Sequence, residues 1–233
     1  MIIYSKNVVK EAIFSKRTIY KLYVDEHIND KYFLQFLDDK NIKYTKVSKH
    51  ELNRLTSQQL HQGVVAEVED YQTYTLEDVL NKSKIQHFII LDGIEDPHNL
   101  GAIIRTAEAS GMDGIIMSKK GAVPLNATVA RVSVGAIERV KVILVSNINQ
   151  AIMTLKNHDV WVVGTDGQTL KTYDDMPKGV SLAVVMGNEG EGIRPLVKQN
   201  CDLLVKIPMH GKINSLNVSV AAALMMYKMK ELL

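Results

Sequence analysis

Two side chains with useful chemistry, Asn99 and Arg105, lie six positions apart in a stretch that follows an apolar run. The amphipathic pattern between Pro97 and Gly111 predicts a helix with Asn99 as its N-cap. Around such a helix the two side chains are about 120° apart, so they can border one cleft without sharing a stripe. An amide and a guanidinium beside helix N–H groups suit a polar or anionic ligand. The competing interpretations are a structural cap for Asn99 and a solvated helix face for Arg105.

A glycine-rich segment, residues 187–193, follows a second apolar run. Its glycine density exceeds what a turn needs, and glycine allows a backbone to approach a ligand and to present its amides. The segment is not a phosphate-binding Walker loop, because no Gly-Lys-Ser/Thr follows it. It is not a dinucleotide-binding fingerprint either, because its glycines do not have the G-x-G-x-x-G spacing. Glu189 in this loop either caps the next helix, expected near residues 193–198, or contacts a polar group of a ligand.

The third segment, residues 203–227, combines an expected strand end at Pro208 with a final helix. Gly211 makes the connecting loop flexible, and Ser215 or Asn214 is expected to cap the helix. The small residues that follow favour close helix packing. Ser215 and Asn217 are polar groups on the expected first turn, so they can also orient a substrate hydroxyl.

The elements that must position these segments are short apolar runs alternating with amphipathic stretches. From residue 86 onward this alternation predicts an α/β fold with a parallel sheet that helices cover on both faces. Ligands of such sheets bind beyond the carboxyl ends of the strands, which is where the three segments lie. Trp161 is expected to pack in the core. The expected strands are residues 87–91, 114–117, 140–145, 160–163, 182–186 and 203–207.

Charge divides the chain into a basic beginning and an acidic connection. Residues 1–62 contain 11 Lys and Arg against 7 acidic residues, a net charge of +4, whereas residues 63–81 contain five acids and no base. The change predicts a domain boundary near residues 70–82. Before it, the pattern predicts a small α/β module with helices at 8–14, 31–37 and 50–55 and strands at 18–24, 42–47 and 64–68. An ordinary solvated surface is one interpretation of its basic residues. The other is contact with RNA phosphates, for which the candidates are Lys6, Lys10, Lys16, Arg17 and Lys21.

Composition excludes several classes of protein. The 233 residues are 46% hydrophobic, which is too high for global disorder. The net charge of +2 does not by itself indicate a nucleic-acid binder. The single cysteine, Cys201, excludes an internal disulfide framework and a multi-cysteine zinc site, and is expected to be a small buried residue. A secretory signal and a membrane-spanning apolar run are both missing from the sequence, so a cytoplasmic location is expected.

Taken together, the three segments resemble the signature motifs of the SpoU (TrmH) family of RNA ribose 2′-O-methyltransferases. The likeness covers residues 86–233. Residues 1–70, with His61-Gln-Gly-Val-Val-Ala66, resemble the family's ribosomal-protein-like RNA substrate-binding domain, although Ser5 stands where relatives commonly have glycine. The matching motifs are Asn99-Leu-Gly-Ala-Ile-Ile-Arg105, Met186-Gly-Asn-Glu-Gly-Glu-Gly192, and Ile207-Pro-Met followed by Ser215-Leu-Asn-Val-Ser-Val-Ala-Ala222.

The resemblance implies a knotted (SPOUT, trefoil) parallel-sheet catalytic domain at residues 86–233, preceded by a small α/β RNA-binding domain at 1–70 and a linker at 71–85. It implies S-adenosylmethionine as cofactor, no metal, and a homodimer that completes the sites. The residues expected to contact the cofactor are Gly187, Ile207, Met209 and Leu216. Those expected to line the catalytic cleft are Asn99, Arg105, Glu189, Ser215 and Asn217.

The implied activity is methyl transfer to the ribose 2′-hydroxyl of an RNA nucleotide, with a guanosine in 23S ribosomal RNA as the expected target. Transfer RNA is the main alternative substrate. A catalytically silent RNA-binding protein on the same scaffold belongs to a different class, and the intact polar set argues against it. A nucleotide-dependent dehydrogenase would need a glycine fingerprint that this sequence lacks.

Overall fold

The chain folds into two compact units, as seen in a computed structural model that describes residues 1–121, 123–188 and 190–233. The first unit contains Met1–Tyr71 together with Leu125–Arg139, and the second contains Gln72–Pro124 together with Val140–Leu233. A stretch from the middle of the sequence therefore belongs to the unit that is otherwise N-terminal.

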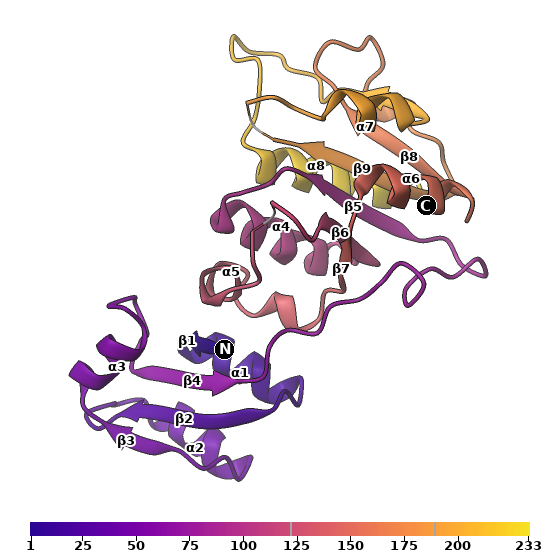
Figure 1. The fold of residues 1–233 in the computed structure, drawn as a ribbon. Coiled ribbons are helices and arrows are strands. Elements are labelled where there is room, and N and C mark those ends of the chain that lie inside the picture. Colours follow the sequence, from indigo (N-terminus) through magenta and orange to yellow (C-terminus); the bar gives the residue numbers. More distant parts are fainter. Residues whose placement is uncertain (122, 189) are drawn as a thin grey trace. The chain divides into compact units, whose positions relative to one another are not determined.

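The first unit is built on a mixed four-stranded sheet in the order β1-β4-β2-β3, in which only β2 and β3 are parallel (Figure 1). Ser5, between β1 and α1, has a φ of 81°, in the left-handed region that favours glycine. The predicted helices and strands of this region are confirmed, and β1 is an addition. The strands are β1 (Ile2–Tyr4), β2 (Ile19–Asp25), β3 (Thr45–Val47) and β4 (Val64–Val68); the helices are α1 (Lys6–Phe14), α2 (Lys31–Asp39) and α3 (Lys49–Leu55).

An insertion that leaves the second unit completes the first one. It contains α5 (Ala127–Val132) and the short 3₁₀ helix η1 (Ala136–Glu138), and Ala127 packs against buried Tyr4 and Val65. Two ion pairs hold it: Arg139 with Glu11, and Arg17 with Glu138, the latter at 2.6 Å with both side chains buried. Sequence patterns place residues 86–233 in one domain, whereas the contacts of residues 125–139 place this stretch in the first unit.

The second unit is built on a six-stranded sheet, parallel throughout, in the order β10-β8-β9-β5-β6-β7 (Figure 1). The predicted parallel α/β sheet is confirmed. Its strands are β5 (His87–Asp92), β6 (Gly114–Ser118), β7 (Val142–Val145), β8 (Val160–Thr165), β9 (Ser181–Gly187) and β10 (Leu203–Val205).

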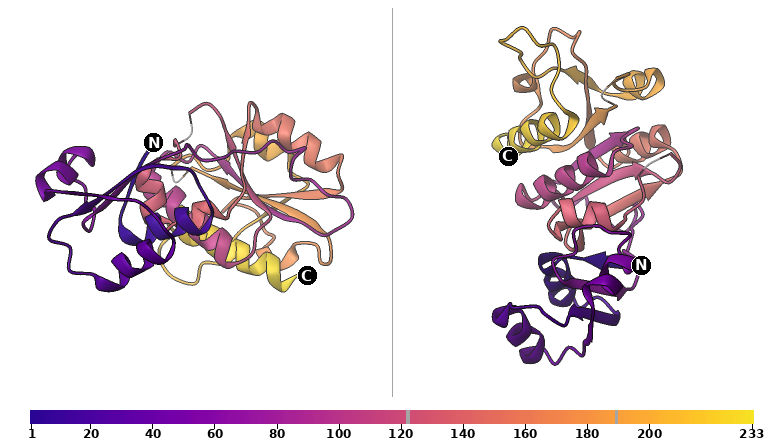
Figure 2. Two further views of the ribbon diagram at one scale, coloured as in Figure 1. Left: turned by 90° about the horizontal axis from the view of Figure 1, so that it is seen from below. Right: turned by 90° about the vertical axis from the view of Figure 1, so that its left-hand side faces the viewer.

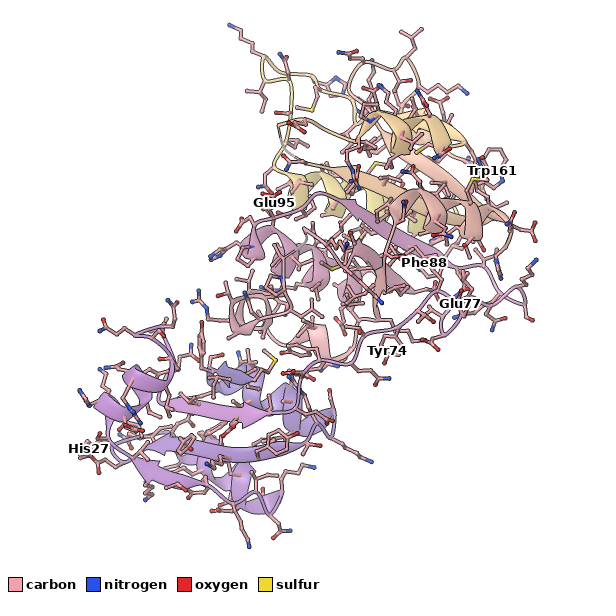
Figure 3. All side chains as sticks on the ribbon, viewed as in Figure 1. His27, Tyr74, Glu77, Phe88, Glu95 and Trp161 are labelled. Atoms are coloured by element: carbon pink, nitrogen blue, oxygen red, sulfur yellow. The ribbon has the colours of Figure 1, made fainter. Side chains whose placement is uncertain are left out.

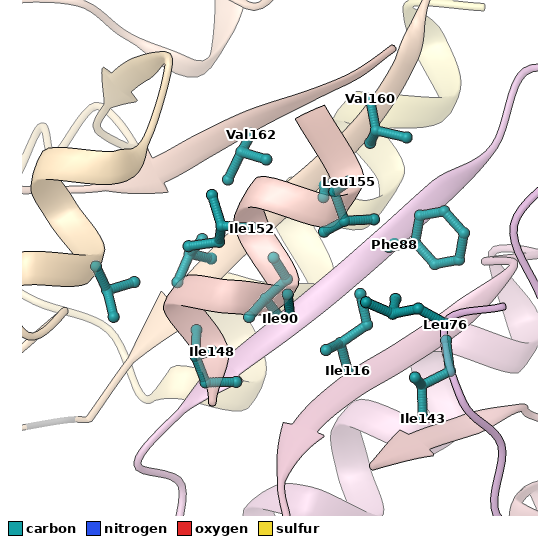
Figure 4. Close-up of a cluster of buried hydrophobic side chains, with 14 of the residues drawn as sticks. Leu76, Phe88, Ile90, Ile116, Ile143, Ile148, Ile152, Leu155, Val160 and Val162 are labelled. Carbon is teal, nitrogen blue, oxygen red and sulfur yellow. The ribbon is translucent and has the colours of Figure 1, made fainter. Parts of the chain in front are cut away.

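Helices cover both faces of this sheet, with α6 on one side and α8 on the other (Figure 2). On the α6 side, Phe88, Ile90 and Ile116 of the strands pack with Ile152 and Leu155 of α6 in one buried cluster (Figure 4). Their neighbours along the strands face the opposite side, because side chains alternate along a strand. Each central strand is thus apolar on both faces. The helices are α4 (Pro97–Ala109), α6 (Ile148–Lys156), α7 (Pro195–Asn200) and α8 (Val218–Glu231), with the 3₁₀ helix η2 (Tyr173–Asp175).

Two expectations about single residues need comment. The prediction for Trp161 is wrong: its side chain is 45% exposed near the beginning of β8 (Figure 3), although Val163 on the same face of the strand is buried. Cys201 is half-buried, and burial raises the pKa of its thiol to about 12.

None of the described helices combines the length and apolar character that crossing a bilayer requires.

Candidate active site

A cavity of about 550 Å³ lies where three neighbouring parallel strands of the second unit end. We call it the strand-end cavity. The segments that line it follow β8, β9 and β10, and the loop before α8 closes it. This is the carboxyl edge of the sheet, the expected ligand position in an α/β fold. Its lining residues are Thr165, Asp166, Gly167, Met186, Lys206, Ile207, Pro208, Met209, Asn214, Ser215, Leu216 and Ala221.

Apolar side chains make up much of the strand-end cavity, and two of its polar side chains, Thr165 and Asp166, have partners within the protein. The Thr165 hydroxyl donates to the carbonyl oxygen of Val185 at 2.9 Å. Asp166 forms an ion pair with Lys198 at 2.5 Å, and the hydrogen bond from Lys198 holds the pKa of the Asp166 carboxyl below its ordinary value. The cavity therefore suits a ligand with a large apolar or aromatic part that is recognised by shape.

The glycine-rich loop after β9 folds back on itself beside the strand-end cavity. The backbone N–H of Asn188 donates to the carbonyl oxygen of Gly192 at 3.1 Å, and the N–H of Gly192 donates to the carbonyl oxygen of Asn188 at 2.8 Å. The backbone of Gly192 and Ile193 lies so close to Gly187 that any Cβ at residue 187 would overlap it. Gly187 is therefore required for close passage of two chain segments. Glu189 lies outside the described residues.

A buried carboxylate fixes the far end of this loop to the neighbouring strand. Asp92, the last residue of β5, has a fully buried side chain and accepts hydrogen bonds from the Arg194 backbone N–H at 2.9 Å and from Nε of the same residue at 2.7 Å. Sequence reasoning missed this pair. The available signal was an acid that ends an otherwise apolar, buried strand, since a buried charge needs a partner.

An amide pair joins the starts of α4 and α8. Nδ2 of Asn217 donates to Oδ1 of Asn99 at 3.0 Å. Oδ1 of Asn217 accepts from the Ser219 backbone N–H at 2.9 Å, so Asn217 is the N-cap of α8. The prediction of Ser215 or Asn214 as that cap is wrong.

The cap of α4 also differs from the expectation. Asp96 accepts from the His98 and Asn99 backbone N–H groups, and Pro97 is the first helical residue. Asn99 is therefore inside the first turn, and its prediction as N-cap is wrong because Asp96 and Pro97 supply the stronger start signal. A cavity of about 160 Å³, the Asn99 cavity, opens here between Asn99, Asn188 and Val218.

The predicted site residues fall into three groups. Ile207, Met209, Ser215 and Leu216 line the strand-end cavity, and Gly187 follows directly on its lining residue Met186. Asn99 and Asn217 form the amide pair, which Leu216 links to the strand-end cavity through its peptide bond to Asn217. Arg105 is exposed on α4 and is absent from the described lining of both cavities.

The five residues that were predicted to contact RNA differ in their exposure and in the partners of their side chains. Lys16 and Lys21 are exposed, whereas Lys6 pairs with Asp30 at 2.7 Å and Lys10 lies 5.3 Å from the ring centroid of Phe36. The five residues are Lys6, Lys10, Lys16, Arg17 and Lys21.

The expectation for Arg17 is corrected. Its side chain is only 7% exposed, its Nη1 binds Glu138, and its guanidinium stacks 3.7 Å from the ring centroid of Tyr71. It therefore holds the insertion and is not available to a phosphate. Among the described residues, the acidic, histidine and cysteine side chains form no group that could hold a metal ion.

Comparison with known proteins identifies both parts of the chain. The sequence model of the SpoU rRNA methylase family matches residues 86–227, and a model described as RNA 2′-O ribose methyltransferase substrate binding matches residues 2–74. A protein of Staphylococcus haemolyticus named as a TrmH family tRNA/rRNA methyltransferase is 43% identical over 98% of this chain and 94% of its own length. The Bacillus subtilis protein YacO, with the same family name, is 41% identical over 96% of this chain and 92% of its own.

Solved structures share the fold along the whole chain. The SpoU methyltransferase AviRb from Streptomyces viridochromogenes, crystallised with its cofactor AdoMet, has a TM-score of 0.84 at 21% identity and covers 99% of this chain and 89% of its own. The AdoMet-bound rRNA methyltransferase from Sinorhizobium meliloti has a TM-score of 0.84 at 23% identity, with 99% and 86% covered. On the family models and the close relatives, the chain belongs to the SpoU (TrmH) family of RNA methyltransferases.

Proposed function

We propose that this protein transfers a methyl group from S-adenosylmethionine to the ribose 2′-hydroxyl of a guanosine in 23S ribosomal RNA. One observation carries the proposal: an apolar cavity at the carboxyl edge of a parallel sheet adjoins, through Leu216, an amide pair that can hold a ribose. The family model matched by residues 2–74, described as a 2′-O ribose methyltransferase substrate-binding domain, supports the choice of the ribose oxygen.

The strand-end cavity fits the cofactor. Ile207, Met209 and Leu216 offer apolar surface for an adenine ring, and the loops after β9 and β10 offer backbone groups for its edges. Gly187 allows the loop after β9 to fold closely beside this cavity, because a Cβ at residue 187 would overlap the backbone of Gly192 and Ile193. AviRb and the Sinorhizobium meliloti enzyme, which share the fold, were crystallised with this cofactor. When bound, S-adenosylmethionine would supply an electrophilic methyl group, whose bond to the sulfonium sulfur breaks as a nucleophile attacks the methyl carbon in line.

Orientation of the ribose is the main task left to the protein, because a neutral hydroxyl is a weak nucleophile and needs a fixed approach. Asn217 is suited to this task, since capping α8 and bonding Asn99 hold its amide in one position. Ser215 lies on the other side of Leu216 and reaches the same cavity, where its hydroxyl can bond the sugar. Glu189 would hold neighbouring polar groups of the substrate.

Arg105 acts as a cation and not as a base, because a guanidinium is not deprotonated in proteins. It would clamp the phosphate next to the target ribose and stabilise negative charge that develops on the 2′-oxygen. Arg105 is exposed on α4, and we assign it to the site of a second copy in a homodimer. Val220, Leu224 and Tyr227, exposed apolar residues spaced along α8, provide a surface for that dimer.

A subunit-mixing experiment tests this assignment. Arg105→Ala and Ser215→Ala should each lose most methyl transfer, and a refolded mixture should recover roughly a quarter of wild-type activity, because random pairing gives half heterodimers with one intact site each. Equal activity in the mixture and in the separate variants would place Arg105 in the site of its own chain.

We favour ribosomal RNA over transfer RNA because an rRNA methyltransferase structure covers more of this chain than a tRNA-modifying enzyme does. The rRNA methyltransferase of Sinorhizobium meliloti covers 99% of the chain, whereas the TrmH/SpoU tRNA modifying enzyme of A. aeolicus covers 67% with a TM-score of 0.57. Residues 1–70 would bind the RNA and residues 86–233 would hold the catalytic site and the family's trefoil knot. A silent RNA-binding scaffold remains the alternative of a different class.

Methyl transfer from tritiated S-adenosylmethionine to RNA from cells that lack this protein tests the function. We expect label in 23S RNA, at a nucleotide whose 3′ phosphodiester resists alkaline hydrolysis, as 2′-O-methylation requires. Label in a base, or in transfer RNA alone, would contradict the proposed target. Calorimetry with S-adenosylmethionine that detects no binding would leave only the silent scaffold.

A further inference from the structure

A cavity of about 470 Å³ in the first unit has no part in the proposed methyl transfer. We call it the first-unit cavity. It lies where the parallel strands β2 and β3 both end, since Asp25 is paired with Val47 in their register. Its walls come from the turn after β2, from α3, and from the loop of residues 58–63 that leads to β4. Three segments that are distant in sequence thus meet at one edge of the sheet.

The loop that forms one wall is built in an unusual backbone conformation. Ser57, Gln58 and Gln62 have φ values of 52°, 64° and 55°, and Gly63 has 78°. Left-handed conformations cost about 1 kcal/mol or more for residues other than glycine, and they persist where the surroundings fix them. Several of them in one short loop indicate a shape that the protein maintains.

Buried His61 fixes this loop from beneath. Its Nδ1 accepts the backbone N–H of Gly63 at 3.0 Å, so the ring proton is on Nε2, which donates to Oδ1 of Asn53 at 3.0 Å. Burial lowers the pKa of His61; the nearby Asp25 opposes this shift and Lys49 adds a smaller lowering, so the neutral ring is favoured. The wall is therefore preorganised before any ligand arrives.

The side chains around the cavity combine amides, apolar surface and a cation. Asn53 lines the cavity, and since its Oδ1 accepts from His61, its Nδ2 group is the donor that the amide offers to a ligand. Gln59 contributes an exposed amide that can donate and accept. Leu60 is 67% exposed, although leucine is usually buried, and provides apolar surface at the mouth.

The charged side chains around the cavity are of both signs. Lys49 is exposed and takes part in no ion pair among the residues that the structure describes. The carboxylate of Asp25 accepts the backbone N–H of His27 at 2.9 Å, and the exposed His27 ring is 3.6 Å from Glu26 (Figure 3). A flat ring with donors and acceptors on its edges, attached to a phosphate, would satisfy the amides, the apolar mouth and Lys49 together.

We infer that the first-unit cavity binds one unpaired nucleobase of the RNA substrate, with Lys49 on the adjoining phosphate. Sequence-specific contacts to RNA usually involve unpaired bases that leave the stack, because the grooves of paired RNA are hard to reach. The net charge of +4 over residues 1–62 favours an RNA backbone at this surface. The inference rests on the proposed function in one respect, that RNA is the ligand.

Hairpin RNAs with and without a single bulged nucleotide test the inference on the full-length protein. Four bulged hairpins, one for each base, and a fully paired control are titrated by fluorescence anisotropy. We expect at least one bulged hairpin to bind about tenfold more tightly than the paired control, and Lys49→Gln or Gln59→Ala to remove most of that preference. Both side chains are exposed, so thermal melting should confirm that the variants fold. Lys49→Arg should restore the phosphate contact.

Lys43→Gln is the matched control. It removes the same charge from the first unit, but residue 43 precedes β3 and so lies at the opposite end of the strand from the cavity. This variant should keep the preference for the bulged hairpin. Equal binding of bulged and paired hairpins by the wild-type protein would overturn the inference. An equal loss of the preference for the bulged hairpin in Lys49→Gln, Gln59→Ala and Lys43→Gln would also overturn it.

Methyl transfer measured in parallel separates this inference from the proposed function. A pocket-dependent preference without transfer to any RNA would refute the enzymatic proposal and leave the base pocket standing. Normal transfer to 23S RNA by Lys49→Gln and Gln59→Ala at low RNA concentration, with no preference for a bulge, would refute the base pocket alone.

Discussion

The strand-end cavity and the first-unit cavity are similar in size but differ in the side chains that line them. The first, of about 550 Å³, presents apolar side chains at the carboxyl edge of a parallel sheet, and its Asp166 is already paired. The second, of about 470 Å³, presents amides and Lys49 on a loop that His61 holds. A ligand of the first is selected by shape and apolar contact, whereas a ligand of the second is selected by hydrogen bonds and charge. This difference is the reason why we propose the methyl donor as the ligand of the first cavity and RNA as the ligand of the second.

The largest expected effect comes from removing the cation that holds the insertion in the first unit. Arg17→Met leaves Glu138 buried without its partner, and we expect this to destabilise the unit by about 3–5 kcal/mol. Urea unfolding measures the change. Preference for bulged RNA should disappear while binding of S-adenosylmethionine persists. Loss of both together would mean that the two cavities do not depend on separate units.

The same variant has a defined pH dependence. Burial raises the pKa of Glu138, and Arg17 opposes that rise. Because the folded state favours the protonated acid, ionisation of Glu138 reduces stability as the pH increases from the ordinary value through the raised one. Without Arg17 this loss is larger, so the difference in unfolding free energy between wild type and Arg17→Met should be greatest at neutral pH and shrink in acid. A difference that is constant with pH would argue against an uncompensated carboxylate.

A charge placed in the strand-end cavity gives the next largest effect. Leu216→Asp puts a carboxylate against apolar lining, and calorimetry should show affinity for S-adenosylmethionine reduced by about a hundredfold. Binding of bulged RNA should stay within a factor of two. Leu196→Asp is the control, since Leu196 is an exposed leucine of α7 outside the cavity lining. Similar loss in both variants would show a general effect of added charge.

A smaller effect is expected from salt, which should lower the affinity for RNA more than the affinity for S-adenosylmethionine. If Lys16, Lys21 and Lys49 contact phosphates, RNA affinity should fall roughly tenfold between 50 and 200 mM salt, while affinity for S-adenosylmethionine changes little. Anisotropy and calorimetry in matched buffers measure the two slopes. An RNA affinity that does not depend on salt would contradict the phosphate contacts and would indicate that the protein contacts only the bases.

Sequence patterns predicted the parallel sheet because each of its central strands is a short apolar run, buried on both faces. Patterns alone singled out Ser215 of the strand-end cavity, whereas Ile207, Met209 and Leu216 were expected there only from the resemblance to the SpoU family. Local start signals misplaced both helix caps by two or three residues: Asp96 replaces Asn99, and Asn217 replaces Ser215 or Asn214.

What the sequence could not show depends on pairs that are distant along the chain. Asp92 and Arg194 are 102 residues apart, and Arg17 and Glu138 are 121 apart. No periodicity connects such residues, so neither the anchoring of the glycine-rich loop nor the insertion at 125–139 could be anticipated. The first-unit cavity was missed for the same reason, because its walls come from three separate segments.

The insertion also determines where this chain can be divided. Val129, Ala130 and Ile137 are buried within the first unit, although they lie in the sequence between two strands of the second. A gene truncated within residues 71–85 would therefore yield one fragment that lacks a packing element and another with bare apolar side chains, and both would be prone to aggregate. Expression of a separate first unit requires that residues 125–139 be grafted back onto it.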